Sequence, residues 1–250
     1  MIVRKSDREI ELMRSAGKIT AGALKLAKEI ARLDVTTDYI NTEVEKYIVS
    51  HGGVPVFKGY RGFPKSICAS INDEIVHGIP DQRRLKEGDI LSIDVGVSYR
   101  KYIADAAITI PIGEVSREIQ NFIDVCEKSL YLAINAIKAN VMLSVISRTV
   151  QEYVEGNGYS VIRNYTGHGV GRYMHEDPQV PNFVNEWLLE YDEALMSGVT
   201  IAIEPMICMG KHETEVLKNK WTVVTKDRKL SAHFEHTIVV TEEGTDILTK

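Results

Sequence analysis

The sequence lacks the long apolar runs that mark membrane proteins. No stretch reaches the ~18 consecutive apolar residues of a membrane-spanning helix. The first residues, MIVRKSDREIELMRSAG, carry a charge every few positions and do not match a secretory signal peptide. Cysteine is also scarce: Cys68, Cys126 and Cys208 are an odd, widely spaced set that suits a reducing compartment better than a disulfide framework. We therefore expect a cytoplasmic protein with no membrane partner.

Basic patches and flexible linkers are missing too. The formal net charge is -5 and no basic stripe interleaved with aromatic residues is present, so nucleic acid is not expected as the main ligand. The chain has 250 residues, of which 44% are hydrophobic, which is enough for a sizeable core. Because no Pro/Gly/Ser-rich linker or low-complexity tract divides it, we expect a single domain over residues 1–250, and a monomer.

Hydrophobic periodicity and turn residues predict helices followed by strands, twice over. The predicted helices cover residues 6–32, 36–51, 116–140 and 147–158, and the first begins with the capping box Ser6–Glu9. The predicted strands cover residues 66–71, 74–79, 89–97, 102–110, 159–166, 199–208, 221–226 and 233–241. This order predicts an α+β domain with two similar halves, approximately residues 1–115 and 140–250.

Two aspartates interrupt strands that are otherwise apolar. If the strands 89–97 and 102–110 form a hairpin that turns between Tyr99 and Arg100, Asp94 lies directly opposite Asp105, with Cβ atoms about 5 Å apart. Two carboxylates so placed repel each other, and burial strengthens the repulsion. The alternative is that each aspartate caps a turn or meets a lysine. Otherwise a shared proton or a cation must compensate.

Three more polar residues lie in or beside predicted core strands. They are His168 in TGHGVG, Glu204 in VTIAIEPMI and Glu235 in SAHFEHTIVV. Four carboxylates, one imidazole and no thiolate favour divalent ions such as Mn, Fe(II), Co or Zn. Since the four carboxylates carry a charge of -4, two such cations would neutralise them. Two metal ions ~3.5 to 4 Å apart activate a water and polarise a carbonyl, which predicts hydrolysis of an amide or ester.

These motifs resemble those of type I methionine aminopeptidases. IDVG with Asp94, Asp105 eleven residues later, GHGVG with His168, IEPM with Glu204 and EHTIVV with Glu235 match the five metal ligands of that family, and the resemblance extends over the whole chain. It implies the pita-bread fold of the creatinase/aminopeptidase class, with two pseudo-symmetric α/β halves around a central antiparallel sheet. It also implies removal of the initiator methionine from nascent proteins, preferably before a small second residue, with the ribosome as a further partner.

The resemblance also assigns roles to residues. Asp94 is implied to bind one metal, His168 and Glu204 the other, and Asp105 and Glu235 to bridge them. Metal-bound hydroxide would attack the scissile carbonyl, with Glu204 as the general base and acid. His175 would donate to the carbonyl oxygen, and His77 would contact the scissile nitrogen. The remaining histidines, His51, His212, His233 and His236, match no motif and are interpreted as structural or surface residues.

The pocket for the first side chain of the substrate is expected to be apolar and aromatic. The resemblance implies that it is lined by Phe57, Tyr60, Phe63, Cys68, His77, Met174, His175 and Trp221. Phe57, Phe63 and Met174 differ from the residues that are common in the family. The bulky Phe57 is expected to narrow the pocket, whereas Met174 can still make soft contacts to a thioether.

A second departure from the family is the acidic segment, which we define as residues 182–198. Its sequence, NFVNEWLLEYDEALMSG, predicts a short amphipathic helix that docks against the domain or a partner near the cleft; the alternative is a surface loop without a role. Two other functions stay open for the chain as a whole. One is an Xaa-Pro peptidase of the same fold, and the other is a non-catalytic module that binds peptides or the ribosome.

Overall fold

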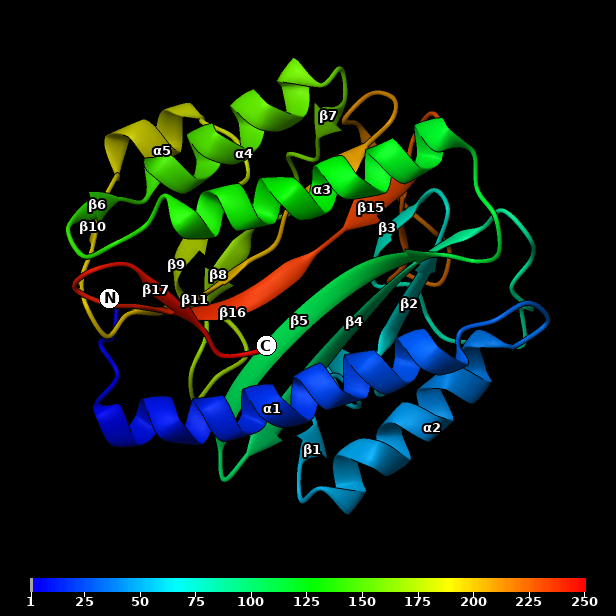
Figure 1. Ribbon diagram of the computed structural model, residues 1–250, viewed down its shortest axis with the longest axis horizontal. Coiled ribbons are helices and arrows are strands. Elements are labelled where there is room, and N and C mark those ends of the chain that lie inside the picture. The colour runs from blue at the N-terminus through cyan, green and yellow to red at the C-terminus, as the bar shows by residue number, and fades with distance from the viewer. Residues whose placement is uncertain (1) are drawn as a thin grey trace.

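The computed structural model describes residues 2–250 and is built around one large antiparallel sheet (Figure 1). The strands follow the order β1-β4-β5-β16-β11-β8-β9, with β2 paired to β4 and β17 paired to β16. Their bounds are β1 Val54–Pro55, β2 Cys68–Ile71, β4 Ile90–Tyr99, β5 Tyr102–Pro111, β8 Gly167–Gly169, β9 Glu176–Val180, β11 Thr200–Ile203, β16 Glu235–Val240 and β17 Thr245–Ile247. The sheet therefore joins segments from both ends of the chain.

Three small antiparallel sheets surround the large one. They pair β6 (Val141–Met142) with β10 (Ala194–Leu195), β12 (Met206–Cys208) with β7 (Ser160–Val161) and β15 (Ser231–His233), and β14 (Val223–Thr225) with β3 (Glu74–Val76) and β13 (Thr214–Val216). The strand predicted over residues 199–208 is interrupted between β11 and β12, where Pro205 has no N–H to donate. The strand predicted over residues 159–166 is only the two-residue β7.

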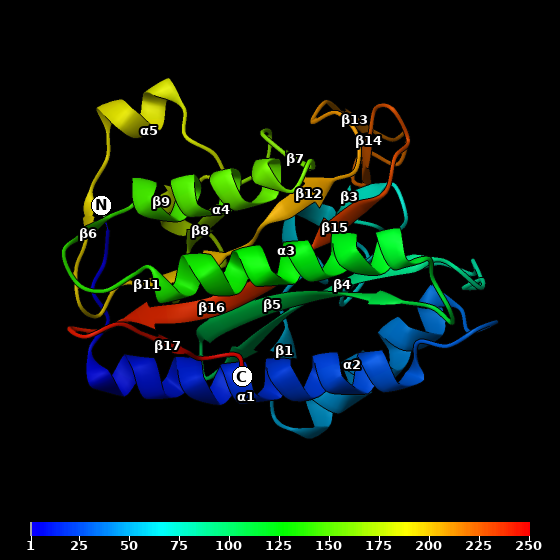
Figure 2. The same cartoon turned by 45° about the horizontal axis from the view of Figure 1, so that its top comes forward.

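Four long helices form two pairs beside the sheet (Figure 2). Their bounds are α1 Asp7–Ile30, α2 Thr37–Ser50, α3 Arg117–Asn135 and α4 Ser144–Gly156, and a 3-10 turn, η1, covers Tyr60–Gly62. All four were predicted from the sequence, with ends that agree within a few residues. Among residues 2–250 no helix combines the length and apolar composition that crossing a membrane requires.

Both helix pairs pack on the same face of the large sheet. Ile93 and Val95 of β4 belong to a buried cluster with residues of α1 and α2. Ile201 of β11 and Ile238 of β16, which are paired, belong to another cluster with residues of α3 and α4. Because side chains alternate along a strand, the residues between these positions point to the opposite face. Helices thus cover one face of the sheet, and the other is left for the polar side chains.

The hairpin of β4 and β5 differs in register from the prediction. Its turn is formed by Arg100 and Lys101, which both have positive φ, as a type I′ turn requires. Asp94 therefore pairs with Ala107, and Asp105 pairs with Gly96. The predicted turn between Tyr99 and Arg100, with the two aspartates directly opposite, was wrong. The observed register is shifted by two residues from the predicted one. Because side chains alternate along a strand, an even shift leaves both aspartates on the same face, as diagonal neighbours.

The acidic segment forms a short helix, α5 (Glu186–Glu190), which stands at one end of the molecule (Figure 2). Asn185 caps it by accepting a hydrogen bond from the Leu188 N–H (2.7 Å), and the Leu188 side chain is fully buried. The segment continues into β10, and the carboxylate of Asp192 accepts a hydrogen bond from the backbone N–H of Ser144 at the start of α4 (2.9 Å). It is therefore docked against the domain, as the first alternative predicted.

The capping box of α1 gives a pH-dependent contribution to stability. Glu9 accepts hydrogen bonds from the backbone N–H of Ser6 (2.9 Å) and the hydroxyl of Tyr102 (2.7 Å), which lower its pKa to about 2. Because this pKa lies below that of an unfolded Glu, about 4.3, the stabilisation is complete above that value and is lost as the pH falls towards 2.

Glu9→Gln should therefore make the thermal midpoint less sensitive to pH between about pH 5 and pH 2 than that of the original protein. Glu29→Gln, at an exposed position near the end of the same helix, is the matched control and should keep the original dependence. Thermal unfolding followed by circular dichroism measures both. Identical pH profiles for Glu9→Gln and the original protein would contradict the assignment.

Candidate metal centre and substrate pocket

Two neighbouring rows of paired residues on the helix-free face carry the candidate metal ligands. The first row crosses β2, β4, β5 and β16 through Cys68, Asp94, Ala107 and Glu235. In the second row Gly96 pairs with Asp105, and Ala202 pairs with His168. Thr237 pairs with Ala202 and lies between the two pairs. The Thr237 hydroxyl joins the pairs, because it donates to the Asp105 carboxylate and accepts from the Asp105 N–H (2.8 and 3.0 Å). Residues far apart in sequence are thus brought to one place.

Small side chains keep the space between these ligands open. Ala107 separates Asp94 from Glu235, and Gly96 lies beside Asp105. Glycines on either side of His168 let two other strands approach closely: a Cβ at Gly167 would lie 2.4 Å from the Ala202 carbonyl oxygen, and one at Gly169 would lie 2.0 Å from that of Asp177. The backbone around His168 therefore tolerates no side chain at these two positions.

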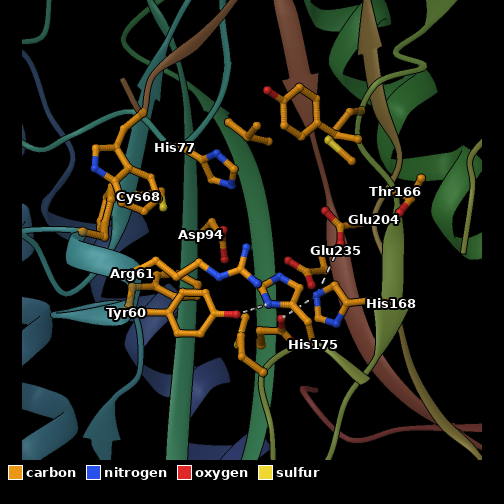
Figure 3. A pocket seen from close by; sticks show the side chains of 18 residues that line it. Tyr60, Arg61, Cys68, His77, Asp94, Thr166, His168, His175, Glu204 and Glu235 are labelled. Atoms are coloured by element: carbon orange, nitrogen blue, oxygen red, sulfur yellow. Dashed lines mark hydrogen bonds and ion pairs between the residues drawn. The ribbon is translucent and has the colours of Figure 1, made fainter. Parts of the chain in front are cut away.

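All five predicted ligands line one cavity of about 210 Å³ (Figure 3). Candidate ligand atoms of Asp105, His168 and Glu235 lie within 4.8 Å of one another. His168 Nε2 lies 3.5 Å from Asp105 Oδ2 and 3.5 Å from Glu204 Oε1. Its other nitrogen, Nδ1, contacts the carbonyl oxygen of Gly169 (2.9 Å), so Nε2 is the nitrogen available to a cation. Asp94 completes the set from the wall formed by β4.

Two carboxylate oxygens in this cavity lack the partners that buried polar atoms normally have. Asp94 Oδ1 and Glu235 Oε1 are buried and accept no hydrogen bond from any residue of 2–250. Unpaired buried oxygens are costly, and a buried carboxylate is paired or coordinates a metal. The donor set of four carboxylates and one imidazole, with these two free oxygens, therefore fits divalent cations.

Burial or neighbouring charges raise the pKa values of four candidate ligands. Burial raises the pKa of Glu204 to about 8, and burial together with neighbouring carboxylates raises those of Asp94 and Glu235 well above their usual range. Burial opposes the charge of His168, but the carboxylate of Asp105 outweighs it and raises the pKa of the imidazole to about 9. Only one carboxylate is thus balanced by a protein cation, and the others require further positive charge to ionise.

All of the predicted substrate residues line the same cavity as the candidate metal ligands, and Phe57 does not close it. His175 Nδ1 is hydrogen-bonded to the Tyr60 hydroxyl (2.8 Å), and Trp221 contacts Phe63 edge to face, with ring centroids 5.1 Å apart. Burial raises the pKa of the Cys68 thiol well above its usual range, so this residue contributes an uncharged apolar surface.

His77 occupies a constrained position in this pocket. Its backbone has a φ of 58°, which is uncommon for a residue other than glycine. Its ring lies edge-on to Trp221 and Tyr165, with centroid distances of 6.2 and 5.9 Å. Burial lowers the pKa of its imidazole, so it is neutral near pH 7. Such backbone strain is typical of residues held for binding or catalysis.

Comparison with known proteins identifies the family. Residues 11–242 match the model of metallopeptidase family M24. The chain is 45% identical to a methionine aminopeptidase of Clostridium perfringens, over 100% of this chain and 99% of that protein. It is 44% identical to methionine aminopeptidase 1 of Bacillus subtilis over the full length of both. The chain belongs to metallopeptidase family M24.

Within this family the fold is that of the methionine aminopeptidases. The crystal structure of the methionine aminopeptidase of Thermotoga maritima superimposes with a TM-score of 0.97, 42% identity and complete coverage of both chains. A prolidase of Pyrococcus furiosus shares the fold, with a TM-score of 0.79 and 23% identity, but this chain covers only 65% of it. The predicted pita-bread fold is thus confirmed, and the protein is a metallopeptidase.

The structure places further residues at or beside this site that the sequence motifs did not indicate. His233 is buried, and its Nε2 lies 3.7 Å from Glu204 Oε2 with no hydrogen-bond partner within residues 2–250. Burial lowers its pKa to about 3. The sequence offered one indication, since His233 and Glu235 alternate within the strand predicted over residues 233–241. The structure divides that strand, with His233 at the end of β15 and Glu235 at the start of β16. Arg61, Tyr165 and Met206, unlike His233, line the pocket itself, and they were not predicted.

The other three histidines fit the structural or surface interpretation. His236 is held between the Tyr131 hydroxyl (3.1 Å) and the Thr249 hydroxyl (2.9 Å), on the face of β16 away from the metal ligands. His51 is exposed at the end of α2, and His212 lies in the loop before β13. None of the three lines the site cavity.

The close approach at Gly169 leads to a test of how His168 is positioned. Gly169→Ala should lower the free energy of unfolding by about 1–3 kcal/mol, because the added methyl group must displace the backbone of β9. It should also weaken Mn²⁺ binding, because a shift of β8, the strand that carries His168, would displace the imidazole. Urea denaturation and calorimetric titration measure the two effects.

Gly156→Ala is the matched control, because a Cβ there meets no atom within 4 Å. It should leave both stability and Mn²⁺ affinity at or above the original values. If Gly169→Ala were as stable as this control and bound Mn²⁺ equally well, the glycine would not be needed for the site.

Proposed function

We propose that this protein is a cytoplasmic methionine aminopeptidase that removes the initiator methionine from nascent chains, with a preference for a small second residue. The observation that carries this proposal is the cluster of Asp94, Asp105, His168, Glu204 and Glu235 in one pocket with apolar and aromatic side chains. Full-length similarity of 44–45% to proteins named methionine aminopeptidases supports the same activity.

Two divalent cations fit this cluster by charge and by donor type. Asp94 would hold one cation, His168 and Glu204 the other, and Asp105 and Glu235 would be shared between them. The four carboxylates would balance two divalent charges, and oxygen donors with one imidazole suit Mn, Fe(II), Co or Zn. When bound, such a pair lowers the pKa of a water molecule and polarises the carbonyl of the scissile bond.

Glu204 is the residue best placed to move a proton. It is partly open to the cavity, whereas Asp105 and Glu235 are almost fully buried. Its backbone carbonyl is fixed by a hydrogen bond from the Asn182 side chain (2.8 Å). We propose that its carboxylate takes the proton of the attacking water and passes it to the leaving amine.

Two neutral histidines would bind the scissile amide. Burial lowers the pKa of His175 to about 4, so its imidazole is uncharged near pH 7. Because Nδ1 is hydrogen-bonded to Tyr60, its Nε2 is available to donate to the carbonyl oxygen of the substrate as negative charge develops there. His77, on the opposite wall, would contact the nitrogen of the same bond.

A peptide panel tests the activity. The protein loaded with Mn²⁺ or Co²⁺ should release methionine from Met-Ala-Ser, and should cleave Ala-Pro-Ala at least 100-fold more slowly, as judged by kcat/KM from chromatography of the products. Removing the cations with a chelator should abolish release, and adding Mn²⁺ back should restore it. The inverse preference would favour an Xaa-Pro peptidase, and the absence of cleavage under every cation would favour a non-catalytic binding module.

The role of Glu204 in proton transfer can be tested separately from its role as a metal ligand. Glu204→Gln should lower kcat for Met-Ala-Ser by about 10²- to 10⁴-fold, because the amide cannot accept the proton. Calorimetry should show at least one cation still bound. The matched control, Glu152→Gln on the exposed side of α4, should keep full activity. A Glu204→Gln variant with undiminished kcat would remove this residue from proton transfer.

A further inference from the structure

A second cavity, which we call the middle cavity, lies next to the substrate pocket. It has a volume of about 640 Å³ and shares Thr166, His168 and His175 with the substrate pocket. The N-terminal segment forms part of its boundary through Val3 and Lys5. Residues of β9, among them Glu176 and Gln179, form another part. The two cavities are therefore neighbours, with His168 and His175 on the boundary of both.

A third cavity, the distal cavity, lies next to the middle cavity and borders α5. It has a volume of about 380 Å³ and shares Asp177 and Gln179 with the middle cavity. Ile2 and Leu143 border it on one side, and the acidic segment borders it with Trp187, Tyr191 and Glu193. The middle and distal cavities both border β9, the last strand in the path of the large sheet, and together we call them the groove.

The charges along this groove are distributed unevenly. In the middle cavity the cations already have acidic neighbours: Lys5 lies 2.7 Å from Glu176, and Arg172 lies 3.8 Å from Glu9. At the distal end the acidic segment contains four carboxylates and no lysine or arginine. One of the four, Asp192, caps α4, which leaves the exposed Glu186, Glu190 and Glu193. The distal end therefore attracts positive charge.

Exposed aromatic side chains lie beside these carboxylates. Trp187 and Tyr191 are 44% and 54% exposed, with ring centroids 5.8 Å apart, although both border the distal cavity. The buried Leu188 and the cap at Asn185 hold the short helix that carries them. Large aromatic rings on an anchored element supply contact area for a peptide at a low cost in conformational entropy.

We propose that this groove binds the substrate chain beyond its second residue, in extended form, and that the acidic segment selects substrates with basic residues near positions four to six. The inference rests on the proposed aminopeptidase activity, because that activity places the substrate N-terminus at the metal site. An extended chain advances about 3.3 Å per residue, as β9 does. The five residues of β9 therefore correspond to about five substrate residues along the groove.

Two hexapeptides test the selection by charge. With the cation-loaded protein at low ionic strength, kcat/KM for Met-Ala-Ser-Gly-Lys-Lys should exceed that for Met-Ala-Ser-Gly-Glu-Glu by about fivefold to tenfold. The ratio should fall in 0.5 M salt, because exposed charges are screened. Glu190→Gln combined with Glu193→Gln should reduce the ratio to less than twofold and leave Met-Ala-Ser unaffected, since a tripeptide does not reach the distal cavity.

Glu29→Gln combined with Glu118→Gln is the matched control, because it removes two exposed carboxylates from α1 and α3 that border neither groove cavity. It should keep the original ratio. Trp187→Ala should raise KM for the Lys hexapeptide about threefold to tenfold without changing kcat/KM for Met-Ala-Ser. Equal kcat/KM for the two hexapeptides, or a preference that persists in the Glu190/Glu193 variant, would overturn the proposal.

A measurement of peptide binding tests this inference independently of the aminopeptidase activity on which it rests. A labelled Met-Ala-Ser-Gly-Lys-Lys peptide should bind the cation-loaded protein more tightly than its Glu counterpart in fluorescence anisotropy, and the Glu190/Glu193 variant should lose the difference. Failure to cleave Met-Ala-Ser would reject the aminopeptidase function alone. Equal affinities of the two hexapeptides for the original protein would reject the selection by charge alone.

Discussion

The pairing of β5 with β4 on one side and with β16 on the other is the constraint on which the site depends. Ala107 is the common partner of Asp94 and Glu235, and the next row contains Asp105. A slip of one residue in either pairing would turn the carboxylates of that strand to the face covered by helices. The apolar residues between them prevent this slip, since Ile93 and Val95 would then lose their places in the core with α1 and α2. Core packing thus fixes the geometry of the acidic cluster.

The same arrangement explains how the fold tolerates several buried carboxylates in one place. Helices and apolar strand residues stabilise one face of the sheet, so the other face can hold unfavourable charges without unfolding the domain. Asp105 and Glu204 each lie 3.5 Å from the His168 imidazole, and Asp105 also accepts a hydrogen bond from the Thr237 hydroxyl. The remaining carboxylates raise their pKa values or need metal ions, and this unmet demand for positive charge is what makes the cluster selective for cations.

The sequence was informative wherever a residue conflicts with its local pattern. Asp94, Asp105, Glu204 and Glu235 were recognisable because each interrupts an apolar strand, and the four long helices followed from periodicity and caps. The register of the β4–β5 hairpin was mispredicted, because nothing in Tyr99-Arg100-Lys101 shows which two residues take positive φ. His233 was not recognised because its importance depends on its distance to Glu204, which is set by the packing of separate strands. The groove along β9 was equally out of reach, since residues 2–5, β9 and α5 meet only in the folded chain. The division into two related halves stays a prediction.

The position of β16 in the sheet has a consequence for how the protein is made. This strand begins at residue 235 of 250, yet it lies in the middle of the sheet, between β5 and β11. A ribosome must therefore have added residue 235 before Asp94 and Asp105 can meet Glu235, and before β11, which leads into Glu204, is joined to β5 through β16. Until then the two parts of the sheet lack the strand that connects them. The five candidate metal ligands of each copy can therefore come together only after β16 has been synthesised.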